Sequence, residues 1–173
     1  TPYYLFEEDA THFHQTCKTA CDKHNPEFYP KYKKQCDEYF WNAHRDEARG
    51  IGGLFFDYCK ANEQMSMENW FNFVTEVGNS FLEAYVPIVE KRKNLLYSEA
   101  NRTWQEIRRG RYVEFNLVHD KGTLFGLKTN GRIESILMSL PPHVQWVYDH
   151  HPEADSEEEK LIHVLENPRN WIN

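Results

Sequence analysis

Hydrophobic and polar residues recur along this chain with two different periods, and the longer period predicts helices. A period near 3.6 residues places apolar side chains on one face of a helix. Capping signals mark several helix starts, with Pro30 in a first turn, Ser98 as a cap and a capping-box pattern at Ser156–Glu159. We expect helices from Glu7 to about Lys23, from Tyr29 to about Gly50, from Ser66 to Tyr85, from Ser98 to Gly110, and from about Glu157 to Glu166.

The helix from Ser66 to Tyr85 has the clearest apolar stripe, and Pro87 should kink or restart it. Its expected inward positions are Trp70, Phe73, Val74, Val77, Phe81 and Leu82.

The shorter period, two residues, predicts strands after Gly110. From Arg111 onward, apolar residues alternate with the polar-face residues Tyr112, Glu114 and Asn116. Asn130-Gly131 favours a hairpin turn, because such turns need positive φ. We expect a three-stranded meander running from Arg111, through Thr123–Lys128, to Arg132–Leu140, and short strands at Pro2–Phe6, Leu54–Asp57 and Trp146–Tyr148. Helices and strands together predict a single α+β or α/β domain over residues 1–173.

Charge and composition exclude several classes of protein. The chain has 173 residues, of which 40% are hydrophobic and 15% aromatic, as expected of a globular domain. A formal net charge of −7 argues against a nucleic-acid-binding protein. No apolar run approaches the ~20 residues of a membrane helix. Four cysteines are too few for a secreted disulfide scaffold and fit a reducing compartment.

Arginines at predicted breaks are candidates for binding an anion. Arg132 follows the Asn130-Gly131 turn, where a guanidinium and backbone N–H groups can together hold a carboxylate. Arg45 and Arg49 lie four residues apart before a glycine-rich segment that would let a ligand approach. The alternative is that these are solvated arginines, with Arg45 and Arg49 complementing the carboxyl end of a helix dipole.

Histidines and cysteines raise the question of a metal. His14, Cys17, Cys21 and His24 share one face of the first helix, but a single straight helix directs only two or three such side chains at one ion. We therefore interpret them as packed cysteines and hydrogen-bonded histidines.

Long segments of the chain closely resemble oxygen-dependent coproporphyrinogen III oxidases, in order and over essentially the whole length. These segments are Thr1–Ala10, His44–Arg45, Arg49–Asp57, Arg108–Leu117 and Glu134–Pro142. The resemblance implies a flat antiparallel β-sheet sandwiched between α-helices. It implies oxidative decarboxylation of two propionates of coproporphyrinogen III to vinyl groups, giving protoporphyrinogen IX in haem biosynthesis. Molecular oxygen is then the oxidant and co-substrate, and no cofactor is required.

The resemblance also assigns residues. It places substrate contacts at Asn130, Gly131 and Arg132, and propionate contacts at Arg45 and Arg49. Some bacterial members are assigned metal-binding histidines at the positions of His14 and His44, so a metal ion there is a weaker expectation. The family's histidine proton donor and an aspartate facing the pyrroles match sequence upstream of Thr1. We therefore expect this chain to be the carboxyl-terminal portion of the enzyme, with Thr1 a cut end, its catalytic group unknown, and no activity alone.

Partners follow from the same resemblance. We expect a homodimer through approximately residues 112–147, where strand edges would need a partner. One alternative function is a catalytically incomplete fragment acting as a structural dimerisation module, and another is a zinc hydrolase using His14 and His44. The expected location is cytoplasmic, with a mitochondrial compartment as the alternative.

Overall fold

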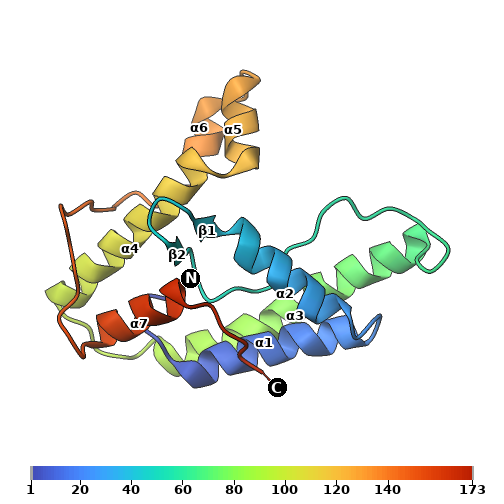
Figure 1. The fold of residues 1–173 in the computed structure, drawn as a ribbon, viewed down its shortest axis with the longest axis horizontal. Coiled ribbons are helices and arrows are strands. Elements are labelled where there is room, and N and C mark those ends of the chain that lie inside the picture. The colour runs from blue at the N-terminus through green and yellow to red at the C-terminus, as the bar shows by residue number, and fades with distance from the viewer. Residues whose placement is uncertain (1, 173) are drawn as a thin grey trace. The chain divides into compact units, whose positions relative to one another are not determined.

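The computed structural model describes residues 2–172 and is mostly helical, with one small two-stranded antiparallel sheet (Figure 1). The elements in order are α1 (Glu7–Asp22), α2 (Phe28–Tyr39), β1 (Trp41–Asn42), β2 (Glu47–Ala48), α3 (Met67–Arg92), α4 (Glu99–Val118), α5 (Lys121–Lys128), α6 (Ile133–Leu137) and α7 (Glu157–Glu166). No helix in this part of the chain is both long and apolar enough to cross a membrane.

The chain forms two compact units, and each is built from separate stretches of sequence. One unit, here called the arginine unit, comprises residues 2–5, Asn42–Gly50 and Leu96–Asn167. The other, here called the aromatic unit, comprises Phe6–Trp41, Ile51–Leu95 and residues 168–172. Two compact units can belong to one folding domain, so the single domain expected over residues 1–173 stays a prediction.

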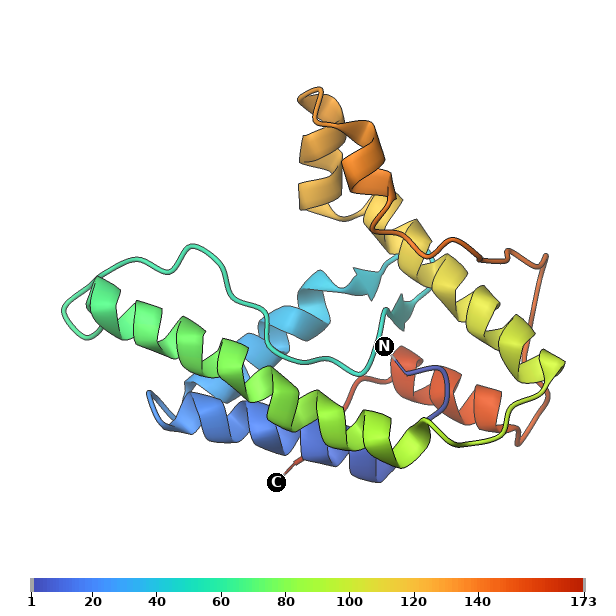
Figure 2. The ribbon, with the colours of Figure 1, turned by 180° about the vertical axis from the view of Figure 1, so that it is seen from behind.

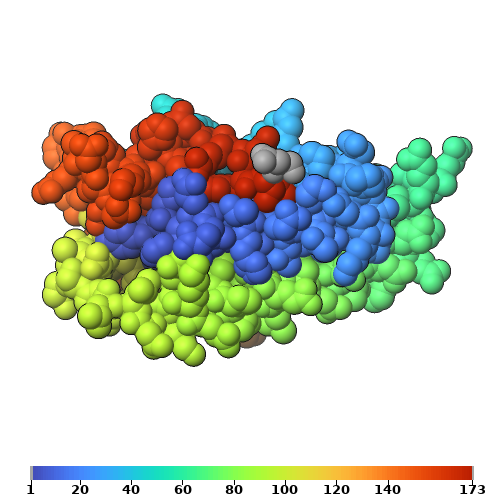
Figure 3. All heavy atoms as spheres, turned by 90° about the horizontal axis from the view of Figure 1, so that it is seen from below, coloured from blue at the N-terminus to red at the C-terminus, as the bar shows by residue number. Residues whose placement is uncertain are grey.

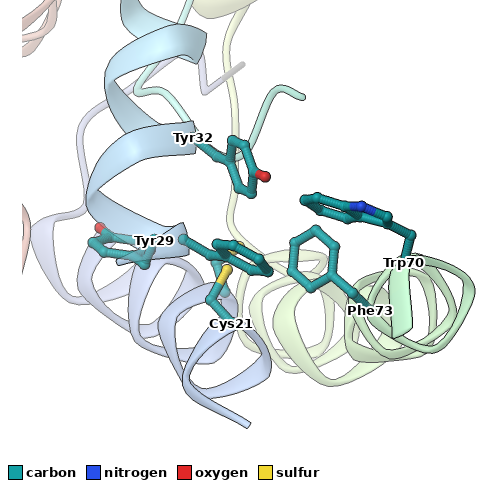
Figure 4. Close-up of a cluster of buried hydrophobic side chains, with 7 residues drawn as sticks. Cys21, Tyr29, Tyr32, Trp70 and Phe73 are labelled. Atoms are coloured by element: carbon teal, nitrogen blue, oxygen red, sulfur yellow. The ribbon is translucent and has the colours of Figure 1, made fainter. Parts of the chain in front are cut away.

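Helices α1, α2 and α3 build the aromatic unit. The blue α1 lies along the green α3 in the space-filling view (Figure 3). Phe73 is fully buried and its ring lies next to that of Trp70 (Figure 4). The ring of Phe28 stacks on Trp70 with centroids 5.4 Å apart. Cys17 and Cys21 lie free and buried in the same core, and burial raises the pKa of the Cys17 thiol to about 11. The interpretation of these cysteines as packing residues is confirmed.

Helix α3 continues through Pro87 to Arg92, although proline normally interrupts a helix. Proline has no N–H to donate to the carbonyl four residues earlier, which is Glu83 O. That carbonyl lies 3.0 Å from His12 Nε2 of α1, which supplies the missing donor. The helix is therefore longer than predicted. Trp70, Phe73 and Val77 face the core as expected, whereas Val74, Phe81 and Leu82 are exposed in this structure.

Helices α4 and α7 build the core of the arginine unit. Trp104 and Ile107 of α4 pack against Leu161 and Leu165 of α7. Ser156 caps α7 by accepting a hydrogen bond from the Glu159 N–H, as the capping-box pattern predicted. Beyond the carboxyl end of α4, the orange α5 and α6 lie side by side (Figure 2).

The predicted strand meander from Arg111 to Leu140 is wrong, because this stretch is helical. Helix α4 runs on to Val118, and α5 and α6 replace the two strands that were expected next. The buried positions of α4 include Trp104, Ile107, Arg108, Arg111 and Phe115, which is a helical spacing. Two of these residues are arginines, so a pattern read from apolar residues alone missed the continuation of this helix beyond Gly110.

Gly110 was expected to end this helix, yet it lies in its interior. A Cβ at this position would lie 2.6 Å from the carbonyl oxygen of Gln145. The residue therefore serves close packing of the 145–146 segment on α4.

The remaining expected strands are also absent from the described residues. Pro2–Phe6, Leu54–Asp57 and Trp146–Tyr148 have no ladder partner, and a strand needs one to satisfy its backbone groups. Helix α2 ends at Tyr39, and the β1–β2 hairpin follows where helix was expected up to Gly50. The β1–β2 hairpin is therefore the whole of the β-structure among residues 2–172.

Candidate functional site

The arginine unit contains a cluster of charged side chains that α4 and the β1–β2 hairpin bring together. Strand β2 supplies Glu47, the turn before it supplies His44 and Arg45, and the residue after it is Arg49. Helix α4 supplies Arg108, Arg111 and Glu114, and His119 follows at its carboxyl end. The hairpin lies beside α4 in the ribbon (Figure 1).

The innermost pair of the cluster is Arg108 with Glu47. Both guanidinium Nη atoms of Arg108 donate to the two carboxylate oxygens of Glu47 at 3.1 Å. Both side chains are buried, so two parallel charge-assisted bonds offset the cost of removing the charges from water. This pair fixes the hairpin on α4.

Glu114 binds the outer members of the cluster. Its oxygens accept hydrogen bonds from Arg45 Nη2 at 2.6 Å and Arg45 Nε at 3.0 Å, and from Arg111 Nη1 at 3.4 Å. Burial opposes ionisation of this carboxyl, but the bonds from Arg45 and the charge of Arg111 outweigh it and lower its pKa. Glu114 is therefore ionised at neutral pH and fixes the edge of the Arg45 guanidinium.

His44 and His119 extend this network towards solvent. His44 Nε2 lies 3.1 Å from Glu114 Oε2, and because an ionised carboxylate only accepts, this nitrogen carries the proton. His44 Nδ1 lies 3.0 Å from His119 Nε2, so one of these two nitrogens donates to the other. The two imidazoles thus continue the hydrogen-bonded chain to the surface.

Arg49 occupies a separate position in the same unit. Its guanidinium carbon lies 5.1 Å from the ring centroids of both Tyr112 and Phe115. Cation–π contact with the two rings holds the side chain against α4. Arg45 and Arg49 therefore both contact α4. They come from the β1–β2 hairpin and the residue after it, and not from one face of a helix as predicted.

Asn130, Gly131 and Arg132 lie in the turn between α5 and α6. Asn130 has a φ of 56°, and the Gly131 N–H donates to Gly126 O at 2.8 Å. The predicted turn is therefore present, but it joins two helices. The exposed Arg132 side chain makes no ion pair or hydrogen bond to any described residue. The structure does not join it to the cluster, and the substrate role of this turn stays a prediction.

His14 belongs to the aromatic unit and is fully buried. Its Nε2 donates to Ile51 O at 2.9 Å, and its Nδ1 lies 3.0 Å from the Tyr29 hydroxyl. Burial lowers the pKa of His14 to about 4, so the imidazole is neutral. Because both nitrogens are engaged, His14 does not fit a metal ligand in this arrangement.

Among the described residues, no group of three or more His, Cys, Asp or Glu side chains could hold a metal ion. A metal at His14 and His44 stays a prediction. The sequence interpretation also missed Glu47, Arg108, Arg111 and His119 as members of a site. Helical spacing of 108, 111 and 115 was the signal that could have found the two arginines.

Comparisons with known proteins identify the family. The family described as Coproporphyrinogen III oxidase matches residues 1–171. Coproporphyrinogen-III oxidase 1, chloroplastic, of Arabidopsis thaliana is 57% identical over 172 residues, covering 99% of this chain and 44% of that protein. The oxygen-dependent coproporphyrinogen-III oxidase of Francisella philomiragia is 58% identical over 172 residues, covering 99% of this chain and 54% of that protein. The chain thus spans about half the length of the curated relatives it matches. On these matches, the chain belongs to the coproporphyrinogen III oxidase family.

Proposed function

We propose that this chain supplies the carboxylate-binding part of an oxygen-dependent coproporphyrinogen III oxidase. The reaction is oxidative decarboxylation of two propionate side chains of coproporphyrinogen III, giving the vinyl groups of protoporphyrinogen IX in haem biosynthesis. The flat sheet between helices that the family resemblance implies belongs to this proposal for the full-length enzyme.

One observation carries the proposal, namely the charge balance of the cluster. Three arginines (Arg45, Arg108 and Arg111) pair with only two glutamates (Glu47 and Glu114), so this set of ion pairs carries an excess of one positive charge. The whole chain carries a formal net charge of −7. A local cationic excess in an acidic protein favours an anionic ligand, and a substrate with four carboxylates meets that requirement.

Each decarboxylation removes the carboxylate as CO₂ and a hydride equivalent from the side-chain carbon attached to the pyrrole ring, and the double bond of the vinyl group forms between the two remaining carbons. Oxygen accepts the two electrons and, with protons, becomes hydrogen peroxide. Arginines that bind a propionate hold its orientation before the bond to CO₂ breaks, and the reaction itself requires no metal. We assign no catalytic acid or base among the residues of this chain.

Turnover tests the proposal directly. A form of the protein with the full length of its relatives, mixed with coproporphyrinogen III and oxygen, should yield vinyl products, and absence of turnover would refute the assignment. The 173-residue chain should instead bind coproporphyrin III without turnover. Absorbance titration measures this binding, and Arg45→Ala and Arg49→Ala should each weaken it by about 10-fold or more.

A second candidate function, a dimerisation module, is favoured by the surface of α5 and α6. Phe125, Ile133, Leu137 and Met138 are large apolar side chains that lie exposed there, within the predicted interface at 112–147. These side chains, and not unpaired strand edges, would form the contact between two copies. Sedimentation at several concentrations should show a dimer that Phe125→Glu dissociates, whereas a persistent monomer counts against it.

Cell location is part of the same proposal. The proposed location is the cytoplasm, with a mitochondrial compartment as the alternative. The name of one relative places that protein in the chloroplast.

A further inference from the structure

The charged cluster is a ladder in which positive and negative side chains alternate from the core to the surface. The order is Arg108, Glu47, Arg111, Glu114 and Arg45. Side-chain exposure rises along it, from 2% at Arg108 through 7%, 11% and 12% to 40% at Arg45. Glu47, Arg111 and Glu114 each contact one member of the series on either side, so a continuous chain of ion pairs connects Arg45 to the buried Arg108.

Glu114 is the member that holds this outer end. Each of its oxygens accepts from two donors, with Arg45 Nε and His44 Nε2 on one, and Arg45 Nη2 and Arg111 Nη1 on the other. A carboxylate offers about four lone-pair sites, so its capacity is used. Glu114 therefore has no acceptor left for a further partner.

Arg45 keeps donors to spare. A guanidinium has five N–H groups, and Glu114 takes only the Nε–H and one on Nη2. Nη1 donates to none of the residues that the structure describes, and the side chain is 40% exposed. The end of the guanidinium formed by Nη1 and Nη2 can therefore bind a second carboxylate side by side.

We propose that Glu114 is a positioning residue, which holds the Nε/Nη2 edge of Arg45 so that the opposite end receives a substrate carboxylate. This inference rests on the proposed function, because it names the ligand as a propionate of the substrate. Fixing a long arginine before the ligand arrives removes side-chain entropy that binding would otherwise cost. Glu114 does not touch the substrate and acts through Arg45.

Two other roles for Glu114 predict opposite results. A carboxylate that competed with substrate for Arg45 would weaken binding, so its removal should tighten it. A carboxylate that only stabilised the fold would change ligand affinity equally with or without Arg45. The sign of the effect and its dependence on Arg45 separate the three roles.

The experiment titrates coproporphyrin III into the 173-residue chain and into the Glu114→Gln, Glu114→Asp, Arg45→Ala and Arg45→Ala/Glu114→Gln variants. Glu99→Gln is the matched control, because it removes the same charge from the exposed first turn of α4. Circular dichroism verifies folding, and Glu114→Asp provides a second variant should the glutamine variant not fold. The Arg45 Nε–H resonance, observed by ¹⁵N NMR, reports positioning without any ligand.

Glu114→Gln should weaken coproporphyrin binding by about 10- to 100-fold, as expected when a binding group is displaced by ~1 Å. Glu114→Asp should restore part of the affinity, and Glu99→Gln should stay within about twofold of wild type. The double variant should match Arg45→Ala. In a full-length enzyme, Glu114→Gln should raise KM with little change in kcat. In the NMR spectrum, the Arg45 Nε–H signal seen in the wild type should be absent from Glu114→Gln.

Tighter binding by Glu114→Gln, or a further loss in the double variant, would overturn the positioning role. So would a wild-type Arg45 Nε–H signal in Glu114→Gln. A wild-type chain that binds no coproporphyrin would instead count against the proposed function, while the NMR result would still decide whether Glu114 positions Arg45.

Discussion

Replacing Glu47 by glutamine should destabilise the arginine unit more than the same change at Glu114 or Glu99. The change leaves the Arg108 guanidinium buried without its carboxylate, and it also removes the partner 3.7 Å from Arg111 Nε. Arg108 Nε already lacks a hydrogen-bond acceptor among the described residues, so no spare partner is at hand. Breaking one side of a buried ion pair costs about 3–5 kcal/mol.

That loss is large relative to the 5–15 kcal/mol of a typical domain. For a chain of this length, about 2–4 °C of melting temperature is lost per kcal/mol, so the expected shift is on the order of 10 °C. Urea and thermal unfolding followed by circular dichroism measure it, with Glu99→Gln as the control for charge alone. A double variant, Glu47→Leu with Arg108→Met, should recover most of the stability, because it leaves no buried charge at either position. A loss below about 1 kcal/mol in Glu47→Gln would refute the reasoning.

Three further predictions follow from single positions. His14, with its pKa lowered to about 4 against an ordinary 6.5, should be neutral in the folded chain and protonated first in the unfolded chain. Stability should therefore be full above about pH 6.5 and fall as the pH drops towards 4, and unfolding midpoints measured across this window should fall less steeply in His14→Gln. Gly110→Ala should lower the melting temperature, because the added Cβ would lie 2.6 Å from Gln145 O. This clash should outweigh the higher helix propensity of alanine. An unchanged or raised melting temperature would show that the segment around Gln145 can move away. Arg132→Ala in a full-length enzyme should lower kcat/KM by ~30-fold or more with the fold intact, and a wild-type value would remove Arg132 from the site and leave Arg45 and Arg49 as the carboxylate anchors.

Local signals in the sequence predicted most of the helix starts. Ser98 and Ser156 are caps in the structure, and α7 has the predicted bounds. These predictions worked because a cap depends on a few adjacent residues and on hydrogen bonds made within one turn. The Asn130-Gly131 turn was recognised for the same reason, although the elements that it joins were not.

The strand predictions failed where tertiary partners decide the structure. In α4 the pattern includes Arg108 and Arg111, whose inward positions make sense only once Glu47 and Glu114 are in place. No periodicity of apolar residues contains that information, since a buried arginine looks like a surface residue in the sequence. The same limit explains the site, where Arg45 was predicted but its partner Glu114 was placed on a strand face.

The ladder also gives a physical reason for pairing Arg45 with Glu114 before any ligand binds, even though this pairing lowers the net charge that Arg45 presents. A lone exposed arginine presents its full charge, but it loses about 2 kcal/mol of rotamer freedom when it is fixed by a ligand. In the ladder, folding has already fixed Arg45, and Glu114 has weakened its net charge. A ligand with one carboxylate would gain little from this exchange. A ligand with several carboxylates gains at each fixed contact and needs the contacts to be placed correctly relative to one another. An arginine positioned through a chain of charges from the core is therefore better suited to a rigid polycarboxylate than to a small single anion.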